Sequence, residues 1–216
     1  MKINLSGIYP EYKKDLLEAV DEMVSIYPVL RKVIKIIHLK KPGKKFKHSF
    51  ATTSSIWGMK LQYEIRLNPA AFKKPDIRWK FISARPAAYY YTVKDVIYHE
   101  IGHCLQHFMP CEKFNLDIDK YNGFNYKKYS ILISESYDEC YREYFNTFLS
   151  LFNWNDSHIN ACFGNYAAEN ILEILPECFN NYYNLKNQYP ELNEAERGAY
   201  EFAKAVIEDY KKYIPK

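Results

Sequence analysis

Apolar residues recur at helical spacing early in the chain and then alternate with polar ones. Between Glu11 and Ile26 acids and lysines separate the apolar positions, which predicts an amphipathic helix that ends before Pro28. The β-branched run Val33–Leu39 predicts a strand, and the alternation from Ile56 to Leu67 predicts a half-buried strand. Residues 68–90, with three prolines, predict a long loop of the kind that often borders a functional site.

Helical periodicity dominates the second half of the chain. Thr92 is a good N-cap residue with Asp95 in capping-box position, and the residues that follow predict one amphipathic helix over Thr92–Phe108. A polar loop, Met109–Lys127, separates it from four further predicted helices: Tyr129–Leu151, Asn155–Phe163, Ile171–Leu185 and Asn193–Tyr213, the last with Glu196 completing a capping box.

These elements predict an α+β fold with a small N-terminal mixed sheet followed by a helical C-terminal half. The length of 216 residues suits one domain. Within it, residues 1–91 are expected to hold the first helix, the sheet and the long loop, residues 92–108 the central helix, and residues 109–216 the helical part.

Composition favours an ordered protein and gives no sign of a nucleic-acid partner. Hydrophobic residues make up 48% of the chain, which is enough for a full core. Thirty basic residues nearly balance 26 acidic ones, so the net charge of +4 does not point to nucleic acid. The lysine-rich loop Lys40–His48 is typical of a solvated turn; a nucleic-acid role would require salt-sensitive binding through Lys44, Lys45 and Lys47.

No segment has the pattern of a membrane span or an export signal. An apolar run of about 18 residues is missing, and Met1–Ser6 does not begin the apolar core of a signal peptide. We therefore expect a cytoplasmic protein without a membrane partner, or one that is phage-encoded or exported without a signal peptide. The five cysteines are scattered singly, so they are expected to be reduced and mostly buried.

The candidate chemistry lies in the segment His99-Glu100-Ile101-Gly102-His103. Residues four apart share one face of a helix, so the two imidazoles can bind one metal while Glu100 leans over the same point. This is the ligand geometry of a catalytic zinc site, although the pattern alone occurs by chance in roughly 1% of chains of this length. Such a site also requires a third protein ligand. Gly102 costs about 1 kcal/mol relative to alanine, which suggests a close neighbour.

Several downstream residues are candidates for the third ligand. His107 follows His103 by one turn, but three ligands from one straight helix cannot close on a single ion, so we expect His107 at the surface or behind the ligands. Gln106 and Met109 occupy the positions where a metzincin has glycine and its third histidine, which excludes that class. Two pairs of glutamates remain, each spaced so that one residue can bind zinc while the other supports it: Glu135 with Glu139, and Glu173 with Glu177.

The motif His-Glu-x-Gly-His, followed by Tyr-Ala-x-x-Asn-x-x-Glu-x-x-x-Glu from Tyr166 to Glu177, resembles the anthrax lethal factor type of gluzincin metallopeptidase. Related domains occur in secreted proline-specific endopeptidases and in phage and mobile-element proteins. The resemblance implies a zincin-like fold and a zinc ion held by three residues, His99, His103 and Glu173. It also implies Glu100 as the base, Tyr166 facing the oxyanion, and Glu177 behind the ligands.

Pro176 departs from this family, which more often has a small residue at that position. Because proline is tolerated only in the first turn of a helix, the helix is expected to begin near Leu172 or to kink at the site.

Other interpretations of the same residues stay open. The motif and the acidic segment after it are also similar to the regulatory metallopeptidases of mobile elements that cleave a repressor, which implies Glu135 or Glu139 as third ligand. Glu173 can alternatively be the capping-box acid of Asn170. A non-hydrolytic binding or virion protein on a peptidase fold is a further alternative. We expect a zinc-dependent endopeptidase that hydrolyses a protein or peptide substrate through a zinc-bound water activated by Glu100.

Overall fold

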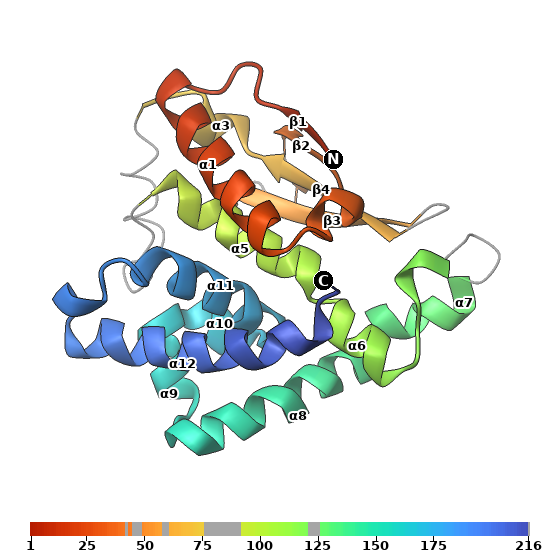
Figure 1. Ribbon diagram of the computed structural model, residues 1–216, viewed down its shortest axis with the longest axis vertical. Helices are drawn as coiled ribbons and strands as arrows, with labels where there is room; N and C mark the ends of the chain where they lie inside the picture. The colour runs from red at the N-terminus through yellow and green to blue at the C-terminus, as the bar shows by residue number, and fades with distance from the viewer. Residues whose placement is uncertain (42, 45–48, 58–60, 76–91, 121–125, 216) are drawn as a thin grey trace.

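A four-stranded mixed sheet forms the N-terminal part of the protein (Figure 1). Its strands are β1 (Lys2–Asn4), β2 (Ile34–Leu39), β3 (Ala51–Trp57) and β4 (Leu61–Leu67), in the order β1-β2-β4-β3. β1 and β4 pair with β2 in parallel, whereas β3 pairs antiparallel with β4 and lies at the edge. Side chains on one face, such as Ile37, Tyr63 and Ile65, are buried in the core. The predicted mixed sheet is confirmed.

The computed structural model describes residues 1–216 except 42, 45–48, 58–60, 76–91, 121–125 and 216, and only the backbone at 56, 57, 61, 126, 133 and 166. The predicted lysine-rich loop therefore lies partly outside the described residues, and the predicted loop over 68–90 lies largely outside them. The first residues of the latter form α3 (Pro69–Phe72), which Asn68 caps. Among the described helices, none combines the length and apolar character needed to cross a bilayer.

The alternating segment Ile56–Leu67 belongs to two strands, so the prediction of one strand is wrong in extent. Trp57 at the end of β3 pairs with Leu61 at the start of β4, and the chain reverses between them. The sequence pattern predicts neither β1, which is only three residues long, nor the body of β3. β3 escapes the pattern because its residues 52–55 are all serine or threonine and show no alternation.

Two long helices, α1 (Pro10–Ile26) and α5 (Val93–Leu105), lie together beside the sheet. The predicted apolar side of α1 is buried except at Leu17, which is exposed. Tyr98 of α5 donates a hydrogen bond of 2.7 Å to Glu22 of α1. The short helix α2 (Leu30–Val33) leads from α1 into β2. Figure 1 shows α5 between the sheet and the helical half, so one helix contacts both parts of the protein.

The helical half follows α5. Its helices are α6 (Phe108–Lys113), α7 (Tyr126–Tyr129), α8 (Glu135–Phe152), α9 (Asp156–Phe163), α10 (Asn165–Glu169), α11 (Ile174–Leu185) and α12 (Glu194–Tyr210). Short 3-10 helices are η2 (Ile118–Lys120), η3 (Ser130–Ile133), η4 (Ile171–Glu173), η5 (Tyr189–Glu191) and η6 (Lys211–Tyr213). The predicted helical C-terminal half is confirmed, and so is the capping box of Asn193 with Glu196 at the start of α12.

Three predicted boundaries from α5 onward are wrong. The helix expected over Thr92–Phe108 ends at Leu105, and the chain turns before α6 begins. The expected polar loop Met109–Lys127 contains most of α6, because Met109 and Cys111 are apolar enough to be buried in the core. The helix expected from Tyr129 is a 3-10 turn followed by α8 from Glu135.

Candidate metal centre

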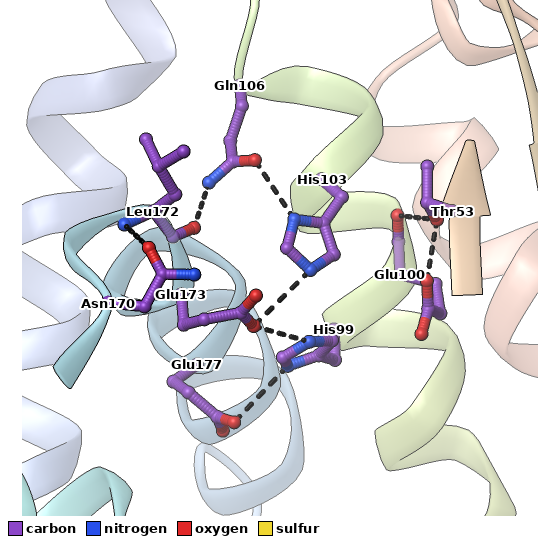
Figure 2. Close-up of polar contacts among 9 residues, drawn as sticks. All are labelled: Thr53, His99, Glu100, His103, Gln106, Asn170, Leu172, Glu173 and Glu177. Carbon is purple, nitrogen blue, oxygen red and sulfur yellow. Dashed lines mark hydrogen bonds and ion pairs between the residues drawn. The ribbon is translucent and has the colours of Figure 1, made fainter. Parts of the chain in front are cut away.

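The capping box predicted at the start of α5 is present. The backbone N–H of Thr92 donates to Asp95 Oδ2 at 2.8 Å, and the Thr92 hydroxyl donates to Asp95 Oδ1 at 2.8 Å. A fixed N-terminus sets the rotation of the helix, and therefore the direction in which residues one turn later point. His99 and His103 consequently lie on the side of α5 that faces α11, and Glu100 lies toward β3 (Figure 2).

Gly102 lets α11 approach α5 closely at this point. A β-carbon placed on Gly102 would lie 2.6 Å from Cα of Pro176, a distance that real β-carbons do not reach. The close neighbour suggested by glycine within the helix is therefore the backbone of α11. Pro176 lies in the first turn of α11, which begins at Ile174, so the proline neither breaks nor kinks the helix. Of the two expectations for Pro176, the start of a helix near Leu172 is the correct one.

Three donor atoms converge between α5 and the start of α11. Glu173 Oε2 lies 3.3 Å from His99 Nε2 and 3.4 Å from His103 Nε2, as Figure 2 shows. The three residues each offer one ligand atom within 4.8 Å of the others and could hold a metal ion. Asn170 caps η4 by accepting from the N–H of Leu172, while the carboxylate of Glu173 faces the imidazoles. The side chain of Glu173 therefore does not act as the capping-box acid of Asn170, and that alternative is wrong.

Each imidazole is also contacted at its other nitrogen. Glu177 Oε1 lies 3.3 Å from His99 Nδ1, which places Glu177 behind the ligands. Gln106 Oε1 lies 2.9 Å from His103 Nδ1, and Gln106 Nε2 donates to the backbone oxygen of Leu172. The sequence motifs do not predict this role for Gln106, which serves there only to exclude a metzincin. Gln106 follows His103 by three residues, so the two side chains share one face at the C-terminal end of α5. This spacing is the feature of the sequence from which the contact could be predicted.

Burial and the two carboxylates set the protonation of this cluster in the metal-free protein. Burial opposes a charged imidazole, but Glu177 and Glu173 outweigh it and raise the pKa of His99 to about 10. The pKa of His103 is also raised, because Glu173 outweighs the effect of its burial. Burial would raise the pKa of Glu173, but His103 and His99 outweigh it and hold that pKa far below its ordinary value.

The cluster lacks one interaction that a cation would supply. Glu173 is 6% exposed, and its Oε2 has no hydrogen-bond partner of good geometry within the described part of the chain. A buried carboxylate oxygen without a hydrogen bond is unfavourable, and the contacts of this one are its ion pairs with two imidazole nitrogens. A divalent ion bound to all three donor atoms would satisfy the carboxylate oxygen, so the residues present fit a metal.

Glu100 is held by the edge strand of the sheet. The hydroxyl of Thr53 on β3 lies 2.6 Å from Glu100 Oε2 and 3.1 Å from the backbone oxygen of Glu100. A hydroxyl has one proton to donate, and the shorter distance favours the carboxylate. Figure 2 shows Glu100 turned toward Thr53. The sequence pattern gives no sign of Thr53, because it belongs to the unpredicted part of β3.

The other residues considered from sequence lie elsewhere. Glu135 and Glu139 are exposed in the first turns of α8, and they are not part of the group that could hold a metal. His107, expected at the surface or behind the ligands, is partly buried: its Nδ1 bonds the hydroxyl of Tyr63, its ring stacks on Tyr137, and burial lowers its pKa to about 4. Tyr166 belongs to α10, but its side chain lies outside the described residues.

All five cysteines are free and buried, as predicted from their scattered positions. The candidate centre thus consists of His99, His103 and Glu173, with Glu177 and Gln106 behind the imidazoles and Glu100 bonded to Thr53. Comparisons of the chain with protein-family models, with curated proteins and with solved structures find no match. The function must therefore be argued from the chemistry of these side chains.

Proposed function

We propose that the protein is a zinc-dependent endopeptidase with a zincin-like fold. The observation that carries this proposal is the convergence of both motif imidazoles and the Glu173 carboxylate on one point. Two histidines and one glutamate are a ligand set of catalytic zinc sites. In a tetrahedral zinc centre with bonds of about 2.0–2.1 Å, two ligand atoms lie roughly 3.3–3.4 Å apart. The distances from Glu173 Oε2 to the two Nε2 atoms, 3.3 and 3.4 Å, agree with that value.

Zinc held by these ligands would polarise a scissile carbonyl and lower the pKa of a water molecule to near neutrality. The chain supplies the proton transfer. Glu100 accepts the proton of the attacking water and passes it to the leaving amine, and Thr53 orients the Glu100 carboxylate for this step. Tyr166 is assigned, on the resemblance alone, to donate to the oxygen on which charge develops.

The position of β3 suggests how a substrate would be held. β3 is, like β1, an edge strand among the described strands, and through Thr53 it contacts the helix that carries the motif. An extended peptide can add to the free edge of a sheet by backbone hydrogen bonds. A peptide bound along β3 would therefore lie beside Glu100, which favours a protein or peptide substrate.

The test combines metal analysis with digestion of a peptide library by the purified chain. We expect zinc bound at one ion per chain and hydrolysis that stops on addition of a chelator. Glu100→Gln is expected to retain zinc and lose turnover, since an amide cannot accept the proton. Cleavage by Glu100→Gln at the parent rate would exclude the mechanism, and a zinc-loaded parent that cleaves no peptide would favour a binding protein instead.

A further inference from the structure

Gln106 joins two parts of the metal centre that are far apart in the sequence. It is 4% exposed at the end of α5, three residues after His103. Its side chain contacts His103 Nδ1 at one end and the backbone oxygen of Leu172 at the other, as Figure 2 shows. Leu172 directly precedes Glu173, so one buried amide touches the second imidazole and the peptide next to the carboxylate ligand.

The chemistry of these atoms fixes the direction of both hydrogen bonds. The backbone oxygen of Leu172 can only accept, so the amide nitrogen of Gln106 must face it. The amide oxygen then faces His103 and can itself only accept, which requires the proton on Nδ1. In the neutral ring, His103 therefore presents a lone pair at Nε2, the atom that faces Glu173.

Helices far along the chain hold Gln106 in place. Its backbone oxygen accepts hydrogen bonds from the hydroxyls of Tyr141 on α8 and of Tyr210 on α12, the latter at 3.0 Å. The two tyrosine hydroxyls are also 2.9 Å apart. These contacts satisfy a carbonyl at the end of α5 and fix the backbone from which the Gln106 side chain extends.

We propose that Gln106 is a positioning residue of the metal centre: it holds His103 in the tautomer that frees Nε2 and ties the Leu172–Glu173 backbone to α5. The inference rests on the proposed zinc site but not on hydrolysis. A neutral amide suits this position because it donates at one end and accepts at the other. A glutamate could accept from His103, but its second oxygen would face the oxygen of Leu172.

Zinc affinity, measured by chelator competition, tests the proposal with Gln106→Leu and Gln106→Glu. The first removes both hydrogen bonds, and the second keeps the bond to His103 but loses the donor to Leu172. We expect each variant to bind zinc about 10–100-fold more weakly, as is typical when a partner of a metal ligand is lost. The Co²⁺-loaded variants are expected to show altered visible absorption, because the ligand geometry changes.

Asn68→Asp is the matched control. Asn68 is also a buried amide, with Nδ2 donating to the oxygen of Ser49 at 2.8 Å and Oδ1 accepting from the N–H of Ala70 at 3.0 Å. It caps α3, so the change loses a similar bond outside the metal centre. Its zinc affinity is expected to stay within about twofold of the parent. Parent affinity in folded Gln106→Leu, or an equal loss in Asn68→Asp, would overturn the proposal.

A measurement on the zinc-loaded parent decides the matter even if the Gln106 variants do not fold. Long-range ¹H–¹⁵N spectra report which imidazole nitrogen carries the proton. We expect His103 to be protonated at Nδ1, and a proton on Nε2 or zinc on Nδ1 would overturn the proposal. A chain that binds zinc but cleaves nothing would contradict the proposed function and leave this inference standing. If the parent hydrolyses peptides and substitution of Gln106 leaves the zinc affinity unchanged, the proposed function stands and the positioning role of Gln106 is contradicted.

Discussion

Gly102 of α5 packs directly against the backbone of Pro176 in α11, with no room for a side chain between them. Gly102 stands between the two motif histidines in sequence, and Pro176 stands between Glu173, at the end of η4, and Glu177 of α11. The distance between the helices therefore decides whether the carboxylates reach the imidazoles. The absence of a side chain at Gly102 is a condition for the metal centre.

Gly102→Ala is expected to destabilise the protein by about 1–3 kcal/mol, because the new β-carbon must push back a helix backbone. It is also expected to weaken zinc binding by moving Glu173 away from the histidines. Gly198→Ala in α12 is the control, since its β-carbon would meet Trp154 at an ordinary 3.7 Å. That change is expected to stabilise by about 0.5–1 kcal/mol through helix propensity. Urea unfolding measures the change in unfolding free energy for each variant. A change of the same sign for Gly102→Ala and Gly198→Ala would contradict the close packing at Gly102.

Substitution of the acids can identify the third ligand. We expect Glu173→Gln to weaken zinc binding most, and Glu177→Gln to weaken it by the roughly 10–100-fold typical of a residue that supports a ligand. Glu135→Gln and Glu139→Gln are expected to leave it unchanged, because both side chains are exposed on α8. Chelator competition gives the order. A large loss on changing Glu135 or Glu139 would restore the repressor-cleaving type of site.

Thr53→Val is expected to lower kcat/KM by about tenfold while leaving zinc content unchanged. The valine keeps the shape and the β-branch but removes the hydroxyl that orients the Glu100 carboxylate, a loss comparable to one hydrogen bond to a charged group. Thr53→Ser should restore most of the activity. Thr52→Val is the control, because alternation along β3 turns that side chain to the opposite face of the sheet. Hydrolysis by Thr53→Val at the parent rate would remove Thr53 from the mechanism.

The stability of the metal-free protein is expected to depend on pH through His99. Its pKa is raised in the folded state from an ordinary 6.5 to about 10, so the charged ring stabilises folding fully below pH 6.5. This contribution is lost as the pH rises toward 10. Glu177→Gln removes the carboxylate that raises this pKa most.

The free energy of unfolding, measured in urea with a chelator present, should therefore differ most between parent and Glu177→Gln near pH 6. The difference should shrink toward pH 10. A difference that grows over this range would contradict the assigned protonation. Zinc binding near neutral pH should release protons, since the ligating rings must be neutral.

The sequence alone predicts those parts of the fold that depend on local signals. Two helix starts are predicted by pairs of capping residues three positions apart, Thr92 with Asp95 and Asn193 with Glu196. Both capping boxes are present. Gly102 within a predicted helix likewise predicts a close packing neighbour, which is Pro176. Boundaries that depend on tertiary contacts are missed, as with β3, which is polar but held by its pairing to β4.

The candidate site shows the same division. His99, Glu100 and His103 follow from spacing on one helix. Spacing leaves two pairs of glutamates as candidates, and the family resemblance selects Glu173 and Glu177. Gln106 and Thr53 follow from neither, because their roles depend on partners 66 and 47 positions away in the chain. Two residues so separated are brought together only by the packing of α5 between the sheet and α11.

The pairing of two imidazoles with two buried carboxylates also determines the charge balance of the centre. Without metal, and at a pH below both raised imidazole pKa values, the charged rings of His99 and His103 offset Glu173 and Glu177. With a divalent ion, neutral rings leave the ion's two charges to offset the same two carboxylates. Exchange of two protons for one ion therefore leaves these groups neutral overall. The candidate site between α5 and α11 can thus be assembled before the ion binds, unlike the site of a small zinc domain that is unfolded without its metal.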